Sequence, residues 1–307
     1  MKKCLSIVLS LFIVVSLAVY VKSMKEKSTV LLKEKSIIGT FNRQKICFQQ
    51  PNFLKKLRIT SSVAIDLSQQ RYKGLAFLYG YNYSKAVHLK SWEKFDHFSA
   101  YTLTPKGNMF LTPMPYISIK EKTFEFQKNI YRIDSSSGKL SIWMRLEDVH
   151  ANSNNPYGVT AIEYDCDDNT LWVSAIDETD YRHNRGVIYH IDINSRKILQ
   201  KLEGVDALSI KLIKSEKGKF LLLGMARESS LYAYSIIDQK IISKSFKLFT
   251  LSNVNERIRK IIIKAENRLK IQTINFSYSL IAQTQEGSVR KNYILTWNDL
   301  LKIFLVN

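Results

Sequence analysis

The sequence lacks the short motifs that identify many enzymes and cofactor-binding proteins. It contains no Gly-x-Ser-x-Gly, no glycine-rich phosphate-binding loop and no Cys-x-x-Cys. Its five histidines include no pair at the spacing of zinc ligands. The acidic run at 165–169 lacks the glycine and the distal glutamate of an EF-hand loop, so we interpret it as a hairpin turn. No catalytic residue can be assigned from motifs.

Cysteine is scarce, with three in 307 residues. Cys4 precedes an apolar run and does not end it, which argues against a lipoprotein. Cys47 and Cys166 are the other two, and one disulfide or two free thiols are equally consistent with the sequence. A domain of this length can bury a sufficient core without such cross-links.

The only targeting signal is at the N-terminus. Lys2 and Lys3 precede an uncharged, mainly apolar stretch from 5 to 21, and Lys22 follows it. This pattern is typical of a signal peptide, although its length also approaches that of a membrane span. We therefore expect an exported protein, periplasmic or secreted, or one anchored by residues 5–21. Cleavage and retention both stay open.

Beyond residue 60 the chain consists of short β-type runs separated by turn residues, and little helical periodicity occurs before 297–304. The second strand of a hairpin begins at Leu171, and equivalent strands begin at Phe220 and Leu269, each 49 residues further on. A third strand ends in an aspartate and polar turn residues at 130–139, 188–197 and 231–240. These features indicate five units that begin near Thr60, Ser99, Gly158, Ala207 and Arg257.

Each unit is predicted to form four antiparallel strands, which is the composition of a β-propeller blade. The segments before Thr60 and after Thr296 are expected to combine into a further blade. We therefore predict an all-β chain with a six-bladed propeller, and five or seven blades as alternatives; a β-sandwich array fits the repeat less well. The predicted organisation is 1–23, signal or anchor; 24–57, linker and first strands; 58–307, propeller.

Two strand openings resemble those of a known group of propellers. Asn155-Pro156-Tyr157-Gly158-Val159, with 169–173 behind it, and 205–208 resemble blade openings of the gluconolactonase and strictosidine synthase-like group. The resemblance covers about residues 99 to 250 at the level of single blades. It implies a divalent metal, calcium or zinc, with Asp206 as one ligand, and a lactonase- or esterase-like hydrolase. Tyr157 stands where the group has an asparagine ligand, and its Glu-Gly-Pro motif has no match here.

Two loops offer candidate binding residues, because polar loops on a rigid sheet often carry function. One is the Asn- and Pro-containing segment 150–157, and the other is the long insertion 177–185, which mixes carboxylates, a histidine and two arginines. Turn formation and ordinary solvation explain the same residues. The candidates for ligand binding are Asn155, Tyr157, Asp177, Glu178, His183 and Arg185.

The formal net charge of +19 favours anionic partners. The stretch 240–270 is the most basic, and it suggests an anionic surface contact through Arg257, Arg259, Lys260 and Lys264, with a solvated strand face as the alternative. Export argues against nucleic acid. The leading hypothesis is an exported propeller that binds an unknown ligand or protein and needs no cofactor; the alternative is a metal-dependent hydrolase that uses Asp206.

Overall fold

The structure is a computed structural model, and it describes residues 38–42, 47–68, 70–95, 97–115, 124–180, 182–278 and 290–306. The predicted signal or anchor segment, residues 5–21, lies outside these ranges. Within them, no helix is long and apolar enough to cross a membrane.

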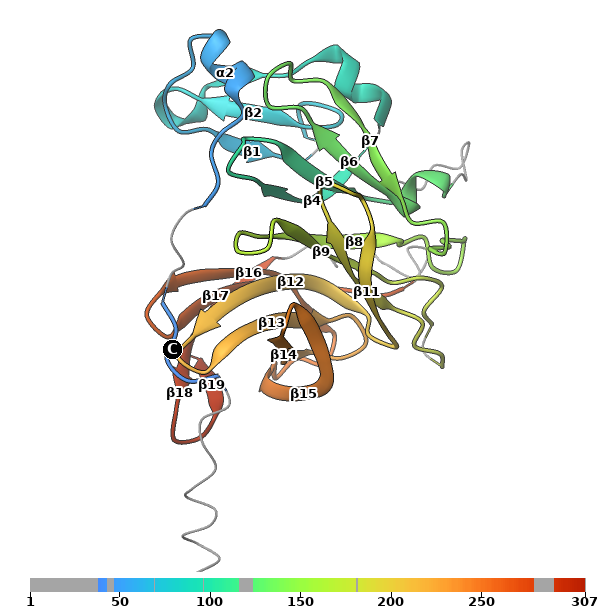
Figure 1. Cartoon of the computed structure of the whole chain (residues 1–307), viewed down its shortest axis with the longest axis vertical. Helices are drawn as coiled ribbons and strands as arrows, with labels where there is room; N and C mark the ends of the chain where they lie inside the picture. Colours follow the sequence, from blue (N-terminus) through green and yellow to red (C-terminus); the bar gives the residue numbers. More distant parts are fainter. Residues whose placement is uncertain are drawn as a thin grey trace, which may run out of the picture. The chain divides into compact units, whose positions relative to one another are not determined.

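The described chain forms five antiparallel sheets, one after another along the sequence (Figure 1). The first has three strands, β1 (Ala64–Asp66), β2 (Ala76–Tyr79) and β3 (Lys85–Val87). The second has β4 (Phe98–Leu103), β5 (Met109–Pro113), β6 (Asn129–Ile133) and β7 (Leu140–Arg145). The third has β8 (Val159–Asp165), β9 (Thr170–Ala175), β10 (Val187–Asp192) and β11 (Ile198–Glu203).

The last two sheets repeat this four-stranded pattern. The fourth has β12 (Ala207–Ser215), β13 (Gly218–Met225), β14 (Ser230–Ile237) and β15 (Lys240–Thr250). The fifth has β16 (Glu256–Ala265), β17 (Arg268–Asn275), β18 (Lys291–Asn298) and β19 (Ile303–Val306). The described helices are short: α2 (Asn52–Lys56) and the 3-10 turns Tyr81–Tyr83, Lys90–Phe95 and Glu125–Lys128.

This architecture is a five-bladed β-propeller, which confirms the predicted all-β class. The five predicted units coincide with the five sheets, whose first strands begin at Ala64, Phe98, Val159, Ala207 and Glu256. The predicted aspartate turns are also present. Asp134 accepts hydrogen bonds from the backbone N–H and the hydroxyl of both Ser136 and Ser137, and these bonds lower the pKa of its carboxyl.

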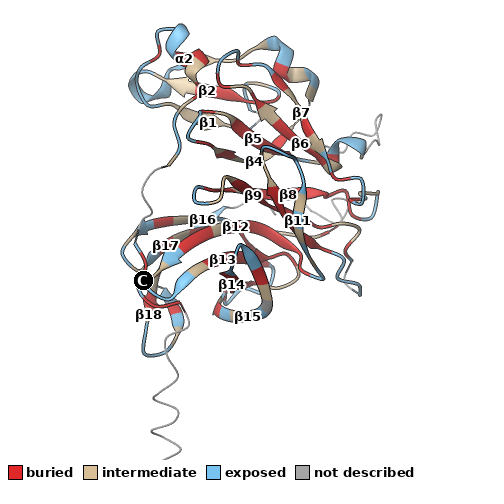
Figure 2. Ribbon diagram, viewed as in Figure 1, coloured by how far each residue is buried: buried red, intermediate tan, exposed pale blue. Residues whose placement is uncertain are grey.

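The core lies between consecutive sheets and along their middle strands. The first strands β4, β8, β12 and β16 are neighbours in chain order, and separate hydrophobic clusters join the first sheet to the second, the second to the third and the third to the fourth. All six residues of β9 are buried, because this strand is covered on both faces. Figure 2 shows the same concentration of buried residues in the middle strands.

The prediction of a sixth blade is wrong, since the described residues form five sheets and those near the two ends of the chain add no further one. Strands β18 and β19 pair with β17 and complete the fifth blade, and the helical periodicity noted at 297–304 is a strand, a turn and a strand. The described residues before β1 form a single bridge, from Phe41 to Ser215, and the short helix α2. Their backbone groups bond to turns of existing blades, so they cannot pair into a new sheet.

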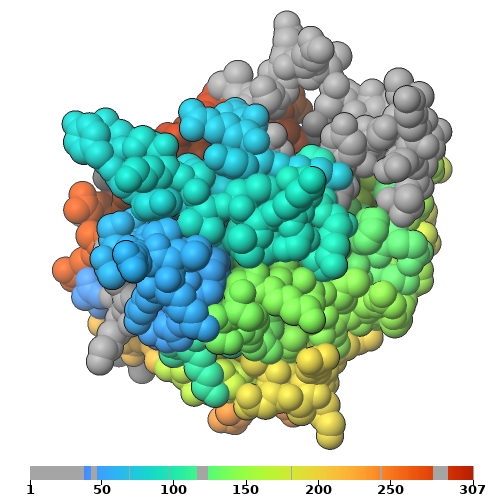
Figure 3. Space-filling view, turned by 90° about the horizontal axis from the view of Figure 1, so that it is seen from above, coloured from blue at the N-terminus to red at the C-terminus, as the bar shows by residue number. Residues whose placement is uncertain are grey.

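We call the described residues 38–42 and 47–57 the strap, because they contact the second to fifth blades at the ends of their hairpins. Phe41 exchanges hydrogen bonds with Asn267 in the β16–β17 turn, its backbone N–H donating to Oδ1 at 3.0 Å. Further along, Phe53 N–H donates to the carbonyl oxygen of Ser135 in the second blade at 2.7 Å. In the space-filling view, the blue residues around α2 lie directly against the green surface of that blade (Figure 3).

A disulfide joins the strap to the third blade. Cys47 pairs with Cys166 in the β8–β9 turn, with 6.2 Å between the Cα atoms and 119 residues between the two positions. This Cα separation lies in the usual range for disulfides. The structure therefore decides between the disulfide and the two free thiols that the sequence left open.

Candidate functional site

The predicted loops lie together at one end of the third and fourth blades. His150 N–H donates to Oδ1 of Asp177 at 2.7 Å, and the backbone of Val205 donates to the carbonyl oxygen of Gly186 at 2.9 Å. A Cβ atom on Gly186 would lie 2.4 Å from Cα of Asp206, so the close approach of these loops requires glycine. The two candidate loops, which the sequence offered separately, are therefore neighbours in space.

The side chains of Asn155 and Tyr157 are buried at this end of the blades and hold its loops together. The Asn155 side chain is buried; its Nδ2 donates to the carbonyl oxygen of Thr179 at 2.7 Å and its Oδ1 accepts from the backbone of Tyr157. Tyr157 is also buried, and its ring packs in a tilted arrangement 5.1 Å from the ring of Phe276, which follows the fifth blade's second strand. These bonds occupy the groups with which Asn155 would hold a ligand.

Three of the four charged candidates have a partner within their own loop, and Asp177 bonds to His150 of the other loop. Arg185 pairs with Glu178 at 3.0 Å, and His183 pairs with Asp180 at 3.1 Å. Burial raises the pKa of the Asp177 carboxyl, although the backbone N–H of His150 and the His150 ring favour its charged form. The arrangement stabilises the loop 176–186, and ligand binding by these residues stays a prediction.

Asp206 is fully buried beneath Tyr278, whose hydroxyl donates to Oδ2. Burial raises the pKa of this carboxyl to about 6, and the Tyr278 bond and the charge of Arg227 lower it in part. Across the described part of the chain, no group of three or more His, Cys, Asp or Glu side chains is placed to hold a metal. The metal role of Asp206, and the hydrolase that it implies, stay predictions.

The basic stretch does not present its four cations on one surface. Arg257 is buried, and its guanidinium donates to the carbonyl oxygens of Ala226 and Arg227, which closes the β13–β14 turn. Arg259 is half-buried and reaches β4, whereas Lys260 and Lys264 are exposed. The predicted anionic surface is therefore corrected at Arg257, whose side chain is occupied inside the fold.

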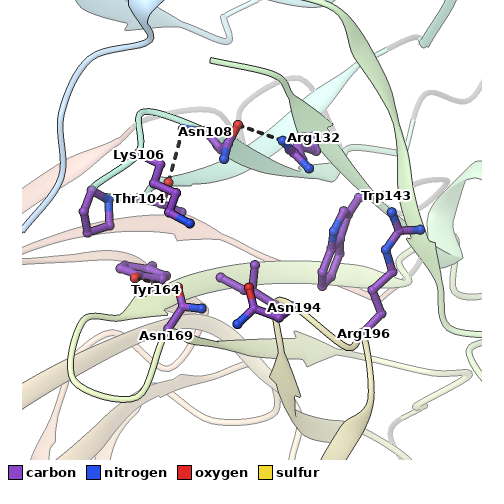
Figure 4. A pocket seen from close by; sticks show the side chains of 11 residues that line it. Thr104, Lys106, Asn108, Arg132, Trp143, Tyr164, Asn169, Asn194 and Arg196 are labelled. Carbon is purple, nitrogen blue, oxygen red and sulfur yellow. Dashed lines mark hydrogen bonds between the residues drawn. The ribbon is translucent and has the colours of Figure 1, made fainter. Parts of the chain in front are cut away.

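A pocket of about 360 Å³ lies at the opposite end of the blades, between the second and third blades. Figure 4 shows its wall: Asn108 and Arg132 on one side, Tyr164 and Asn169 across from them, and Trp143 and Arg196 at one end. Its lining residues come from the turns β4–β5, β8–β9 and β10–β11 and from strands β6, β7 and β8: Thr104, Pro105, Lys106, Asn108, Arg132, Trp143, Tyr164, Asn169, Ile193, Asn194 and Arg196.

The pocket wall is rich in hydrogen-bond donors and carries three cations, Lys106, Arg132 and Arg196. The eleven lining residues include neither aspartate nor glutamate. Arg132 is held in place by Oδ1 of Asn108 and by Asp134, each at 3.0 Å. Arg196 lies 5.9 Å from the ring centre of Trp143, so an aromatic face supports its guanidinium. Such a wall suits an anion.

The sequence does not reveal this pocket, because its lining residues are far apart in the chain and belong to two different blades. One of these turns, β10–β11, bears the repeated aspartate-turn pattern, which on its own indicates only a hairpin. Lys106 extends from the β4–β5 turn and Arg196 from the β10–β11 turn, and only the packing of the second blade against the third brings them together. The signal that could have indicated the pocket is the presence of a cationic residue, Lys106 or Arg196, in each of these two turns.

No family model and no curated protein matches the chain. Among solved structures, it is similar to the extracellular domain described for a one-component system of B. thetaiotaomicron, with 12% identity, 89% of this chain covered and a TM-score of 0.46. The chain spans only 28% of the length of that structure.

It is also similar to the β-propeller domain of Cps50 (Swd1) from Myceliophteria thermophila, with 10% identity, 87% of this chain and 88% of that chain covered, and a TM-score of 0.43. The PQQ-bound aldose sugar dehydrogenase of Streptomyces coelicolor follows at 8% identity, 76% and 98% coverage and a TM-score of 0.27. At these values the propeller assignment rests on the strand order and register of the chain itself.

Proposed function

We propose that this protein is an exported, non-enzymatic β-propeller that binds a small anionic ligand in the pocket between its second and third blades. The observation that carries the proposal is the wall of that pocket, whose lining residues include three cations and no carboxylate. Its volume of about 360 Å³ falls within the range of small-molecule sites. An anionic ligand would compensate the charges of Lys106 and Arg196, whereas Arg132 is already paired with Asp134.

The donor geometry further supports a ligand that has both an anionic group and hydroxyl or carbonyl groups. Asn108 and Asn169 use their Oδ1 atoms to accept from Arg132 and from the Tyr164 hydroxyl, at 3.0 Å in both cases. Because each Oδ1 already accepts a hydrogen bond, the Nδ2 atom of each side chain is the group that would donate to a ligand oxygen. Arg132 and Arg196 would hold a carboxylate or phosphate, and the two amides would hold neutral oxygens.

Export is supported by two independent features. The apolar stretch at 5–21 with its preceding lysines has the composition of a signal or anchor segment. The Cys47–Cys166 disulfide is of a kind that persists in oxidising compartments and is rare in the cytosol. A ligand-binding protein of the periplasm or cell exterior agrees with both features.

Thermal unfolding in the presence of inorganic phosphate, glucuronate or neutral glucose tests the proposal. At a ligand concentration ten times Kd, the folded state gains about 1.4 kcal/mol, which corresponds to a rise in Tm of about 2 to 3 °C for a domain of this size. We expect the rise with at least one of the two anions and none with glucose.

The variant Arg196→Gln should abolish this rise, because it removes a cation of the pocket wall. Lys197→Gln is the matched control: it lies next in the chain, is exposed, loses the same charge and does not line the pocket. Equal loss in both variants would show that the anions act through general charge screening, and an unchanged rise in Arg196→Gln would contradict the proposed site.

A further inference from the structure

The strap connects the two facing walls of the pocket. One wall is the β4–β5 turn, which contributes Thr104 and Asn108, and the wall across from it comes from β8 and the β8–β9 turn, with Tyr164 and Asn169 (Figure 4). Strap residues 47–53 contact both walls without lining the pocket themselves. A segment that joins two walls in this way can determine the distance between them.

The contact with the wall of the third blade is covalent. Cys166 lies in the β8–β9 turn, between Tyr164 and Asn169 in the sequence, and its sulfur is bonded to that of Cys47. The Tyr164 hydroxyl donates to Oδ1 of Asn169 at 3.0 Å, so the two pocket residues of this turn are also joined to each other. Cys47 packs against the hydrophobic cluster that contains Tyr164 and Trp143. The position of the disulfide therefore bears directly on this wall.

The contact with the wall of the second blade consists of a hydrogen bond and close packing. The backbone N–H of Gln49 donates to the carbonyl oxygen of Thr104 at 3.3 Å. Beside it, a Cβ atom on Gly107 would lie 2.9 Å from the carbonyl oxygen of Gln50, so the strap and this turn approach closely only because of the glycine. Between Cys47 and Gln49 the extended chain spans about 7 Å at most. A very short segment thus joins the two walls.

A second pair of bonds leads from the strap to the polar residues of the pocket. The backbone N–H of Asn52 donates to the Ser135 hydroxyl at 3.0 Å, and that of Phe53 donates to the Ser135 carbonyl oxygen at 2.7 Å. The N–H of Ser135 in turn donates to Oδ1 of Asn108 at 3.1 Å, and the same oxygen accepts from Arg132. The strap is therefore connected through Ser135 to two residues that line the pocket.

The β8–β9 turn is attached on its other side to the fourth blade. Nζ of Lys219, in β13, donates to the carboxylate of Asp165 at 2.7 Å and to that of Asp168 at 2.8 Å. The strand before the turn has its own link to β4, because the N–H of Tyr164 donates to the Thr102 hydroxyl at 3.1 Å. Without the disulfide, β8 would stay in place, and the turn would keep its attachment to the fourth blade alone.

We propose that the strap sets the geometry of the pocket and that the Cys47–Cys166 disulfide, by positioning the β8–β9 turn, determines the affinity for the anionic ligand; this role rests on the proposed function of the pocket. A dithiol would reverse it: the S–S bond breaks, two electrons and two protons give two thiols, and the dithiol becomes a disulfide. Asn169 would then no longer be held at a fixed distance from Asn108. Groups that must be ordered on binding contribute less affinity than groups already in place.

Isothermal titration calorimetry with inorganic phosphate and with glucuronate tests this role. The oxidised wild type is compared with the variant in which Cys47 and Cys166 are both replaced by alanine. The anion that binds the wild type should bind the variant about tenfold more weakly, because side chains of the turn must then be ordered on binding. Dithiothreitol should lower the affinity of the wild type to that of the variant, and re-oxidation should restore it. The reductant should leave the variant unchanged.

Gly158→Ala is the matched control for a general loss of stability. Its new Cβ would contact Gln127 at the other end of β8, and neither residue lines the pocket or belongs to the strap. We expect the affinity of this variant for the anion to equal that of the wild type.

Amide hydrogen exchange without ligand examines the strap separately from the proposed function. In the double-alanine variant, amides at 104–108 and 163–169 should exchange faster than in the oxidised wild type. The β10–β11 turn at 193–197 also lines the pocket, but among the described residues no backbone hydrogen bond joins it to 47–53, so its exchange should not change.

Three results would overturn the proposal: equal affinity in the oxidised wild type and the double-alanine variant, the same loss of affinity in Gly158→Ala, or unchanged exchange in both turns. If neither anion binds the oxidised wild type, the proposed function fails, and the role of the disulfide in affinity fails with it. The exchange data then still show whether the strap holds the two walls, so the two failures are distinguishable.

Discussion

The buried carboxyl of Asp206 gives the protein a specific dependence of stability on pH. Its side chain is fully buried, and Oδ2 accepts a hydrogen bond from the hydroxyl of Tyr278. Within the described residues, Oδ1 has no hydrogen-bond partner. An ionised carboxylate at this position is therefore poorly compensated, which explains the rise of its pKa from 3.8 to about 6.

The sign and size of the effect follow from the two pKa values. The folded state binds the proton more tightly than the unfolded state, so the contribution of Asp206 to stability is fully present below about pH 4 and is lost as the pH rises through 6. The shift of about two pKa units corresponds to about 3 kcal/mol. Asp206→Asn cannot ionise, and it should therefore become more stable relative to the wild type by about this amount between pH 4 and pH 7.

Urea unfolding of both proteins at pH 4, 5, 6 and 7 measures this difference. His190 acts in the opposite direction, because burial lowers its pKa and its contribution is lost as the pH falls, but it is common to both proteins and cancels. In Tyr278→Phe the bond that favours the carboxylate is lost, so the transition should move above pH 6. A difference between wild type and Asp206→Asn that is constant within about 0.5 kcal/mol would refute the reasoning.

Two further predictions concern the strap and the blade contacts. Replacing Cys47 and Cys166 together by alanine should lower the free energy of unfolding by about 2 to 5 kcal/mol, because the disulfide closes a loop across 119 residues. Urea unfolding should give the same free energy for this variant and for the reduced wild type. A variant as stable as the oxidised wild type would contradict this prediction. Gly158→Ala should destabilise the fold by about 1 to 3 kcal/mol or more, since the new Cβ would lie 2.2 Å from the carbonyl oxygen of Gln127. An unchanged Tm in calorimetry would contradict this, because it would show that a small backbone shift removes the clash.

Much of the fold could be predicted because the blades repeat locally. The strands that begin near Leu171, Phe220 and Leu269 are the second strands β9, β13 and β17, whose alternation and turns are properties of neighbouring residues. The number of blades, in contrast, is not determined by neighbouring residues. It depends on whether the two ends of the chain pair with each other, and the strap instead bonds to turns of four blades.

For the candidate site, the sequence could identify the two polar loops, 150–157 and 177–185, but not the contacts of their residues. The partners of Asp177 and Arg185 depend on loop geometry that no spacing in the sequence reveals. The pocket around Arg196 requires the packing of two blades, which is a long-range consequence of the fold.

The central claim is that the pocket between the second and third blades binds an anion, and a crystal structure tests it most directly. Crystals of the protein, grown without phosphate, sulfate or carboxylate buffers, would be soaked with phosphate or glucuronate, whichever raises Tm more. The account predicts an anionic group within hydrogen-bond distance of the guanidinium groups of Arg132 and Arg196. An empty pocket at a concentration that saturates the Tm rise in solution would contradict it.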